Sequence, residues 1–471
     1  MKNKEFRKHA HQMVDWIADY FEVIEEYPVK SKVTPGEIAG NLPSEPPLKG
    51  ETMDDIFEGF KENIMPGITH WQHPGWFAYF PANSSPPSVL GEFLTAGLGV
   101  QGMVWDTSPA ATELEEVVMD WLRQMIGLPV NFTGVIQDTA SIATLCALIS
   151  AREKISNFKT NQTGFQQKLR IYTSNQTHSS IEKGIKIAGF GKENLVYIDT
   201  DEEFALIPQK LEEAILRDLE SGYTPCCVVA TCGTTSSLAM DPLTETGHIC
   251  KKYNIWFHVD AAFAGTAAIA PEFRYVLKGA ELSDSLVFNP HKWMLTNFDC
   301  SAYFVKDPEI LKQSFSLMPE YLKTAADGKV NNYRDWGIQL GRRFRALKLW
   351  FVIRYYGIEG IQEMIREHVR LGQLFASWVE KDDNFEFTAP PSLTLVCFRL
   401  VKEGMPEEKI NSMNEKLLYI VNDQEDIYLT HTKLNGRYTI RMSIAQRNTK
   451  QHHVEKAWEI ITEAGKSLIK Q

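Results

Sequence analysis

The sequence contains few cysteines, no excess of basic residues and no long apolar run. Its seven cysteines among 471 residues form no CxxC pair, which favours buried small side chains over a zinc site. A net charge of −11 argues against a surface for nucleic acid or an anionic membrane. No segment reaches the roughly 18 consecutive apolar residues that a membrane-spanning helix needs. We therefore expect a small-molecule partner, with no nucleic acid and no membrane.

The N-terminus and the cysteine count bear on the cellular compartment of the protein. Residues 1–9 are charged and lack the apolar segment of a secretory signal. An odd number of cysteines in a long chain without secretory features suits a reducing environment. Composition is that of a soluble globular enzyme, with 44% hydrophobic and 23% charged residues. These features predict a cytoplasmic protein.

Helical and extended patterns alternate from about residue 115 onward. Apolar runs at 169–174, 194–199, 225–233, 255–260 and 286–288 predict strands, and helical patterns lie between most of them. Strands joined by helices of this length imply right-handed crossovers and a mostly parallel sheet with both faces covered. The fold class is therefore α/β.

The two ends of the chain differ from this middle part. Residues 5–25 have apolar positions at helical spacing over a wide face, which predicts packing against another surface such as a second subunit. A long helical pattern at 341–381 leads into strands and helices that predict a small α+β part. We expect an N-terminal helical and extended dimerisation segment (1–84), a large domain (85–365) and a small C-terminal α+β domain (366–471).

Two charged residues follow or end buried apolar strands. Lys292, in "NPHKW", comes shortly after the run 286–288, where its amine could form a Schiff base with a carbonyl cofactor. The alternative is an ordinary surface ion pair. Asp260 ends "IWFHVD", and a buried carboxylate there needs a partner such as a protonated pyridine nitrogen. Pyridoxal 5'-phosphate (PLP) has both the carbonyl and the pyridine.

A phosphate needs its own site, and residues 138–141 offer one. Thr139, Ala140 and Ser141 precede an apolar helix, where backbone N–H groups and hydroxyls suit a phosphate dianion. The alternative is a plain helix cap by Asp138 or Thr139. His178 lies at a strand-to-helix turn, where it could stack on a cofactor ring or cap the helix locally.

Two other patterns carry less weight. "GLGVQG" (97–102) matches GxGxxG but follows a helical pattern, so NAD binding and a dehydrogenase activity are poorly supported. His70 and His73 lack a third ligand at a recognisable spacing, and we expect no metal.

Several longer stretches resemble one known family when they are taken together. They are "HPGWFAYFP", "DTSPAATELEEVVMDWL", "GVIQDTAS", "THSSIEKG", "HVDAAFAG", "NPHKW", "NFDCSA" and "YRDWGIQLGRRFRALKLWFV". Their order along almost the whole chain is similar to that of the group II PLP-dependent amino acid decarboxylases, and most closely the aromatic-L-amino-acid decarboxylases. The resemblance implies the PLP-dependent fold type I, which is aspartate aminotransferase-like. It also implies a homodimer with its active site at the subunit interface.

The resemblance assigns roles around the cofactor, position by position. Lys292 would carry PLP, Asp260 would pair with the pyridine nitrogen, and Ala262 and His178 would lie against opposite faces of the ring. The other cofactor-binding residues implied or predicted are Thr139, Ala140, Ser141, Asn289, His291 and Thr235.

Further roles concern the substrate and a mobile loop. Tyr333 lies on a loop at about 320–337 that resembles the family's catalytic lid, and it would help to protonate Cα. Residues expected at the substrate pocket are Trp71, Tyr79, Phe80, Pro81 and Phe298, with Gln101 and Met103 reaching the pocket of the partner subunit.

The implied reaction is decarboxylation of an aromatic L-amino acid, namely tryptophan, 5-hydroxytryptophan, tyrosine, DOPA or phenylalanine. Departures from the family's usual residues at Ala82, Gln101, Met103 and Ile142 leave the choice among these substrates open. One alternative is an aldehyde synthase, which decarboxylates and oxidatively deaminates; those relatives typically replace the stacking histidine or the loop tyrosine. A second alternative is a relative that has lost catalysis.

Overall fold

The computed structural model describes residues 1–317 and 328–470. A seven-stranded sheet has the order β1-β7-β6-β5-β4-β2-β3. Its strands are β1 (Thr133–Gln137), β2 (Leu169–Ser174), β3 (Leu195–Ile198), β4 (Thr224–Thr231), β5 (Trp256–Asp260), β6 (Ser285–Phe288) and β7 (Ser301–Val305). The pairs among β2 to β6 are parallel, and β7 runs antiparallel to both β1 and β6. The α/β class and the mostly parallel sheet are confirmed, whereas β1 and β7 were not expected.

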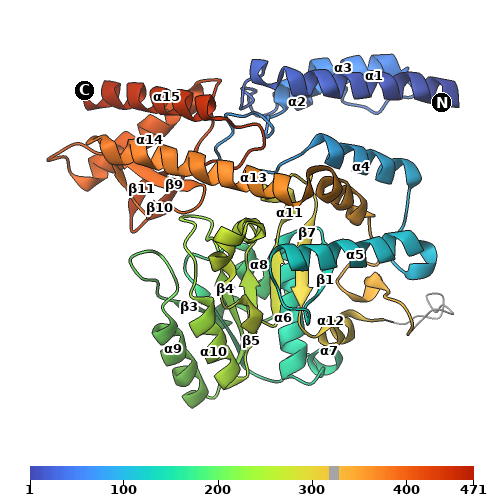
Figure 1. The fold of residues 1–471 in the computed structure, drawn as a ribbon, viewed down its shortest axis with the longest axis vertical. Helices are drawn as coiled ribbons and strands as arrows, with labels where there is room; N and C mark the ends of the chain where they lie inside the picture. The colour runs from blue at the N-terminus through green and yellow to red at the C-terminus, as the bar shows by residue number, and fades with distance from the viewer. Residues whose placement is uncertain (318–327, 471) are drawn as a thin grey trace.

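Helices cover both faces of this sheet (Figure 1). Along β4, Val228 and Ala230 share one core with α9 and α10, while Cys227 and Val229 share another core with α6 and α8. This alternation explains why β4 is apolar throughout. The helices of this part are α5 (Pro109–Met125), α6 (Ala140–Ile155), α7 (Thr160–Thr163), α8 (Ser180–Ile187), α9 (Pro208–Glu220), α10 (Leu243–Tyr253), α11 (Pro290–Trp293) and α12 (Pro308–Phe315).

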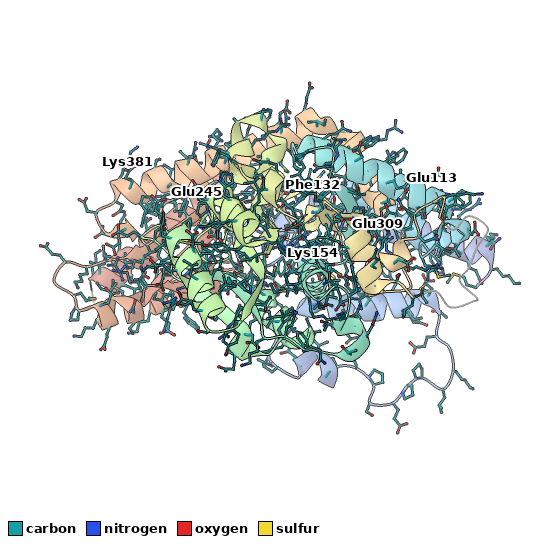
Figure 2. The ribbon with its side chains drawn as sticks, turned by 90° about the horizontal axis from the view of Figure 1, so that it is seen from below. Glu113, Phe132, Lys154, Glu245, Glu309 and Lys381 are labelled. Atoms are coloured by element: carbon teal, nitrogen blue, oxygen red, sulfur yellow. The ribbon has the colours of Figure 1, made fainter. Side chains whose placement is uncertain are left out.

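A four-stranded antiparallel sheet of order β10-β11-β9-β8 forms the C-terminal part with its own core. Its elements are β8 (Phe385–Phe387), β9 (Leu395–Leu400), α14 (Glu407–Asp423), β10 (Thr430–Leu434), β11 (Arg437–Ser443) and α15 (Gln451–Ile469). Helix α13 (Arg345–Lys381) kinks at Gly357 and packs on both parts. The expected boundary at 365/366 therefore falls inside a helix. Figure 2 shows Lys381, at the end of α13, and Glu245, on α10, at the outside of the molecule.

The N-terminal helices α1 (Asn3–Glu22), α2 (Glu37–Gly40) and α3 (Met53–Gly59) lie together along one side of the molecule, above α4 (Pro86–Leu98) in Figure 1. Helix α1 has no buried residue. Gly99 caps the end of α4 in the left-handed conformation, so the glycines of "GLGVQG" end a helix and do not follow a strand. Within residues 1–317 and 328–470, no helix combines the length and apolarity needed to cross a membrane.

Candidate active site

A cavity of about 200 Å³ lies at the carboxyl ends of β4, β5 and β6. Parallel strands bring their carboxyl ends to one edge, and loops at that edge commonly form ligand sites. The first turns of α6 and α8 close the cavity from the other side. Its lining consists of Phe80, Thr139, Ala140, Ser141, His178, Ser180, Thr231, Gly233, Thr235, Asp260, Ala262, Phe263, Asn289, His291 and Lys292.

Lys292 lies on the one-turn helix α11, directly after β6. Burial lowers the pKa of its amine below the ordinary lysine value, and the carboxylate of Asp260 opposes that shift. Its Nζ lies 5.6 Å from the centre of the Phe80 ring. Among the residues that the structure describes, Nζ has no hydrogen-bond or ion-pair partner. A buried amine without a partner, facing a cavity, is suited to covalent chemistry.

Asp260 is the last residue of β5 and is only 4% exposed. Its Oδ1 accepts a hydrogen bond of 3.0 Å from the backbone N–H of Ala262. Oδ2 accepts none within the described part of the chain. A buried carboxylate with a free oxygen at a cavity wall favours a positively charged or N–H-bearing ligand.

The first turn of α6 forms the opposite end of the cavity. Thr139 caps the helix by accepting from the N–H of Ile142, and Asp138 accepts from the N–H of Thr139 at 2.6 Å. The backbone N–H groups of Ala140 and Ser141 therefore start the helix without an acceptor in the described residues. Free amides at a helix N-terminus bind phosphate groups well.

Asn289 adds a donor to this end. Its Oδ1 accepts a hydrogen bond of 2.6 Å from Ser301 on β7. That bond orients the carboxamide, so the NH₂ group remains available to an anion in the cavity.

His178 lines the cavity from the turn before α8. Its Nδ1 accepts from the backbone N–H of Ser180 at 3.2 Å and lies 2.8 Å from the Ser180 hydroxyl. Burial lowers the pKa of His178, which the Asp260 carboxylate opposes and the Lys292 amine reinforces. Because Nδ1 accepts from the Ser180 N–H, the neutral ring carries its proton on Nε2.

This geometry fits PLP. The amine could bind the aldehyde carbon, the Asp260 carboxylate could meet the ring nitrogen, and the α6 amides with Asn289 could hold the phosphate. Residues 35–401 match the family model of the pyridoxal-dependent decarboxylase conserved domain. The chain belongs to this family. It is a PLP-dependent carboxy-lyase, and its fold is the PLP-dependent fold type I.

Relatives along the whole chain support the assignment. A phenylacetaldehyde synthase from Arabidopsis thaliana is 46% identical over 100% of this chain and 97% of the relative. An aromatic-L-amino-acid decarboxylase from Mus musculus is 43% identical over 100% of this chain and 99% of the relative. The crystal structure of Oryza sativa TDC with PLP and tryptamine has a TM-score of 0.97 at 36% identity, covering 100% of this chain and 99% of that one.

The enzyme brings together every residue that the sequence placed around the cofactor. The residues expected at the substrate pocket are spread more widely, since only Phe80 lines the cavity, stacked on Phe263 at 4.0 Å. Phe298 packs on His291 at 4.6 Å and is largely exposed. Tyr79 is half exposed and stacks on Trp71 at 5.9 Å.

Three further residues of that set lie outside the cavity lining. Pro81 is buried next to Phe80 in the sequence. The side chain of Gln101 accepts from the N–H of Arg342 at 2.6 Å, and the carbonyl of Met103 accepts from the N–H of Arg334 at 2.9 Å. A single chain does not test whether Gln101 and Met103 contribute to a partner's pocket, so that contribution stays a prediction.

Tyr333 is not among the residues that line the cavity of this chain. It is 2% exposed and packs against Trp336 at 5.4 Å, with the Arg342 guanidinium 4.7 Å from its ring centre. Burial raises the pKa of its hydroxyl well above the usual tyrosine value. Its expected role in protonating Cα stays a prediction. The rest of the expected lid includes residues 318–327, which lie outside the described residues, and Tyr321 is among them.

Several lining residues were missed in the sequence. Thr231 ends β4 beside Asp260, which ends β5. Both residues close successive apolar runs in the sequence, and this pattern could have predicted that Thr231 lies at the same edge of the sheet. Gly233 adopts φ +89°, and a Cβ there would lie 2.8 Å from the Cβ of Ala264. Ser180 and Phe263 carried no local signal.

A second cluster of ligating groups lies away from the cavity, at Glu25, His452 and His453. The backbone N–H of Lys450 donates to Nδ1 of His453 at 2.9 Å, which leaves the ring proton on Nε2, 3.3 Å from the Glu25 carboxylate. A protonated Nε2 is a hydrogen-bond donor and not a metal ligand. The contact therefore fits a histidine–carboxylate pair between the N-terminal segment and α15.

Proposed function

We propose that the enzyme converts an aromatic L-amino acid to the corresponding amine and carbon dioxide. The observation that carries this proposal is the unpartnered amine of Lys292, facing the Asp260 carboxylate across a cavity whose wall includes Phe80. A second aromatic side chain, Phe298, packs on the cavity residue His291. Flat apolar surfaces of this kind favour an aromatic substrate side chain.

The cofactor would be held at three points by the chain's own residues. Lys292 would bind its aldehyde carbon, Asp260 would pair with its ring nitrogen, and the amides of Ala140 and Ser141 would hold its phosphate, with Thr139 and Asn289 as further donors. His178 and Ala262 would enclose the two faces of the ring, while Thr235 and His291 complete the wall. When bound, PLP accepts the electron pair that remains on Cα after carbon dioxide departs.

The side chains contribute orientation, charge and exclusion of water. The ionised Asp260 favours a proton on the group that it faces, because an opposite charge at close range stabilises both ionised forms. The lowered pKa of Lys292 increases the fraction of neutral amine, which is the nucleophile and proton acceptor. The neutral ring of His178 covers the cavity without adding charge. Fixing the phosphate at the α6 N-terminus restricts the orientation of everything attached to it.

The substrate class is tested by comparing kcat/KM for tryptophan, 5-hydroxytryptophan, tyrosine, DOPA, phenylalanine, histidine and glutamate. We expect one of the first five to be preferred, with glutamate and histidine at least about 100-fold poorer, since neither fills an aromatic pocket as well. A preference for glutamate or histidine would overturn the aromatic assignment.

An aldehyde synthase is the second candidate, and the 46% identity to a phenylacetaldehyde synthase favours it. That reaction consumes one molecular oxygen and one water and releases aldehyde, ammonia, hydrogen peroxide and carbon dioxide. The histidine at position 178, which lines the cavity, and the tyrosine at position 333 both support simple amine production. We expect one amine per carbon dioxide. Stoichiometric peroxide and ammonia would establish the synthase instead.

A homodimer in the cytoplasm completes the proposal. Helix α1 exposes Phe6 and Val14, and α4 exposes Leu90, Phe93 and Leu98. Apolar surface of this extent on neighbouring helices suits a second copy of the chain. Light scattering is expected to give twice the chain mass, and an active monomer would contradict the dimer.

A further inference from the structure

Asn83 is a buried carboxamide that joins three separate segments of the chain. It is 1% exposed and lies between the cavity residue Phe80 and α4. Its Nδ2 donates to the carbonyl of Lys292 at 2.7 Å and to the carbonyl of Ala445 at 2.8 Å. Its Oδ1 accepts from the backbone N–H of Arg447 at 2.8 Å. Both amide protons and the carbonyl oxygen are therefore used.

The backbone of Lys292 needs such a contact because α11 is only four residues long. A single helical turn is not stable by itself. The N–H of Lys292 donates to the carbonyl of Asn289 at 2.9 Å, and the Lys292 carbonyl has Asn83 as its donor. The two bonds fix the peptide groups on either side of the Cα from which the amine extends.

The same carboxamide also holds the C-terminal part in place. Ala445 and Arg447 follow β11, and β11 carries the buried Arg441. Arg441 donates to the carbonyl of Thr235 at 2.7 Å, and its guanidinium lies 5.4 Å from the Phe80 ring centre. Asn83 thus sets the distance between the Lys292 backbone and the cavity wall that the C-terminal sheet supports.

We propose that Asn83 is a positioning residue, which fixes the Lys292 backbone relative to the rest of the cavity. This inference rests on the proposed role of Lys292. It acts through hydrogen-bond donation, since no atom of Asn83 lines the cavity. Small displacements of reacting groups can cost about 100-fold in rate, so a loss of these bonds should affect cofactor binding and turnover beyond its effect on stability.

The test compares Asn83→Ala and Asn83→Asp with Ser84→Ala in the full-length holoenzyme. Asn83→Asp has nearly the same shape and can still accept from Arg447, but it replaces the NH₂ group that donates to two carbonyls by one oxygen facing both. Ser84 is the matched control, because its N–H donates to Gln72 while its hydroxyl makes no hydrogen bond in the described residues.

For both Asn83 variants we expect the Kd for PLP to rise by about 10- to 100-fold and kcat at saturating PLP to fall by a similar factor. The visible absorption of bound PLP should also shift. Asn83→Asp should be at least as impaired as Asn83→Ala, and Ser84→Ala should match the unaltered enzyme. Asn83→Ser keeps one donor, so its PLP affinity and kcat should lie between those of the unaltered enzyme and Asn83→Ala. If either of the other Asn83 variants does not fold, Asn83→Ser takes its place in the test.

A purely structural role predicts a different outcome. If both variants lower only the unfolding temperature of the apoprotein, with PLP affinity, absorption and kcat unchanged, the positioning role is wrong. Borohydride reduction separates this failure from that of the proposed function. If reduction attaches no cofactor to Lys292 in the unaltered enzyme, the proposed role of Lys292 fails, whatever the Asn83 variants show.

Discussion

Desolvation lowers the pKa of both Lys292 and Lys348, and the surroundings of the two amines differ in one respect. Lys348, on α13, is fully buried beneath α4 and forms an ion pair of 2.9 Å with Glu92. Burial lowers the pKa of Lys348 to about 8, and the nearby Cys300 and Asp299 oppose that shift. Lys292 has a pKa lowered by the same cause, but it faces a cavity and has no ion-pair partner among the described residues.

The comparison shows that burial alone does not mark a reactive amine. The backbone of Lys348 also packs tightly against α4, since a Cβ added to Gly91 would lie 2.7 Å from the Cα of Lys348. The backbones of α4 and α13 are therefore closely packed at this point. Lys292 combines a lowered pKa with free volume and a carboxylate placed across that volume. Availability to a ligand therefore decides between a structural and a chemical role.

Removing the amine at the cavity should have the largest effect. Lys292→Ala is expected to lower kcat/KM by at least about 1000-fold, because it removes the nucleophile and proton carrier from the site. Steady-state kinetics with saturating PLP measures this loss. A variant that retained more than a tenth of the activity would place the reactive amine elsewhere.

Asp260→Asn should have the next largest effect. The amide keeps the shape and can still accept from the N–H of Ala262, but it loses the negative charge that faces the cavity. We expect kcat to fall by about 100-fold, with PLP still bound. Unchanged kcat in this variant would mean that the carboxylate does not face the group that accepts electrons.

Removing the other lysine should affect folding more than chemistry. Lys348→Ala leaves a void beneath α4 and deprives Glu92 of one partner, so the free energy of unfolding should fall by about 3 kcal/mol. Denaturant unfolding of the apoprotein measures this change in the free energy of unfolding. The value of kcat/KM should stay within about threefold of that of the unaltered enzyme. A loss of PLP attachment in this variant would erase the contrast between the two lysines.

The pH dependence of cofactor uptake sharpens the comparison. The neutral form of Lys292 reacts, so uptake of PLP by the apoprotein should increase with pH around a midpoint below the ordinary lysine value of 10.5. The Asp260 charge raises the pKa of Lys292, hence Asp260→Asn should move the midpoint to lower pH. Stopped-flow absorption measures both midpoints, and a move to higher pH would contradict the assignment.

The smallest effect is expected at Tyr333. Its hydroxyl is buried away from the cavity, so Tyr333→Phe should leave kcat/KM within about threefold and change stability by about 1 kcal/mol. Tyr321→Phe is the informative partner, because Tyr321 is the other tyrosine of the expected loop. A larger kinetic loss in Tyr333→Phe than in Tyr321→Phe would support the expected role of Tyr333 in protonating Cα.

The large sheet could be predicted where apolar runs are continuous, as in β4 and β5. β7 could not be placed, because its antiparallel insertion between β1 and β6 is set by distant pairing and not by the residues 301–305 themselves. Lys292 and Asp260 were visible because a charge at the end of a buried strand is costly without a ligand.

Other site features depend on contacts that a linear sequence hides. Tyr333 sits in a loop that the motifs suggested, but its packing against Arg342, which is bound to Glu115 at 2.6 Å on α5, depends on distant parts of the chain. The partners of Asn83 are separated from it by 209 to 364 residues. Residues expected to serve a partner's pocket have no test in a single chain.

The most direct measurement is borohydride reduction of the purified holoenzyme, followed by peptide mapping. The account predicts one pyridoxyl group per chain, attached to Lys292, with Lys348 unmodified. Attachment at Lys348 or any other lysine, or no attachment in protein saturated with PLP, would contradict it.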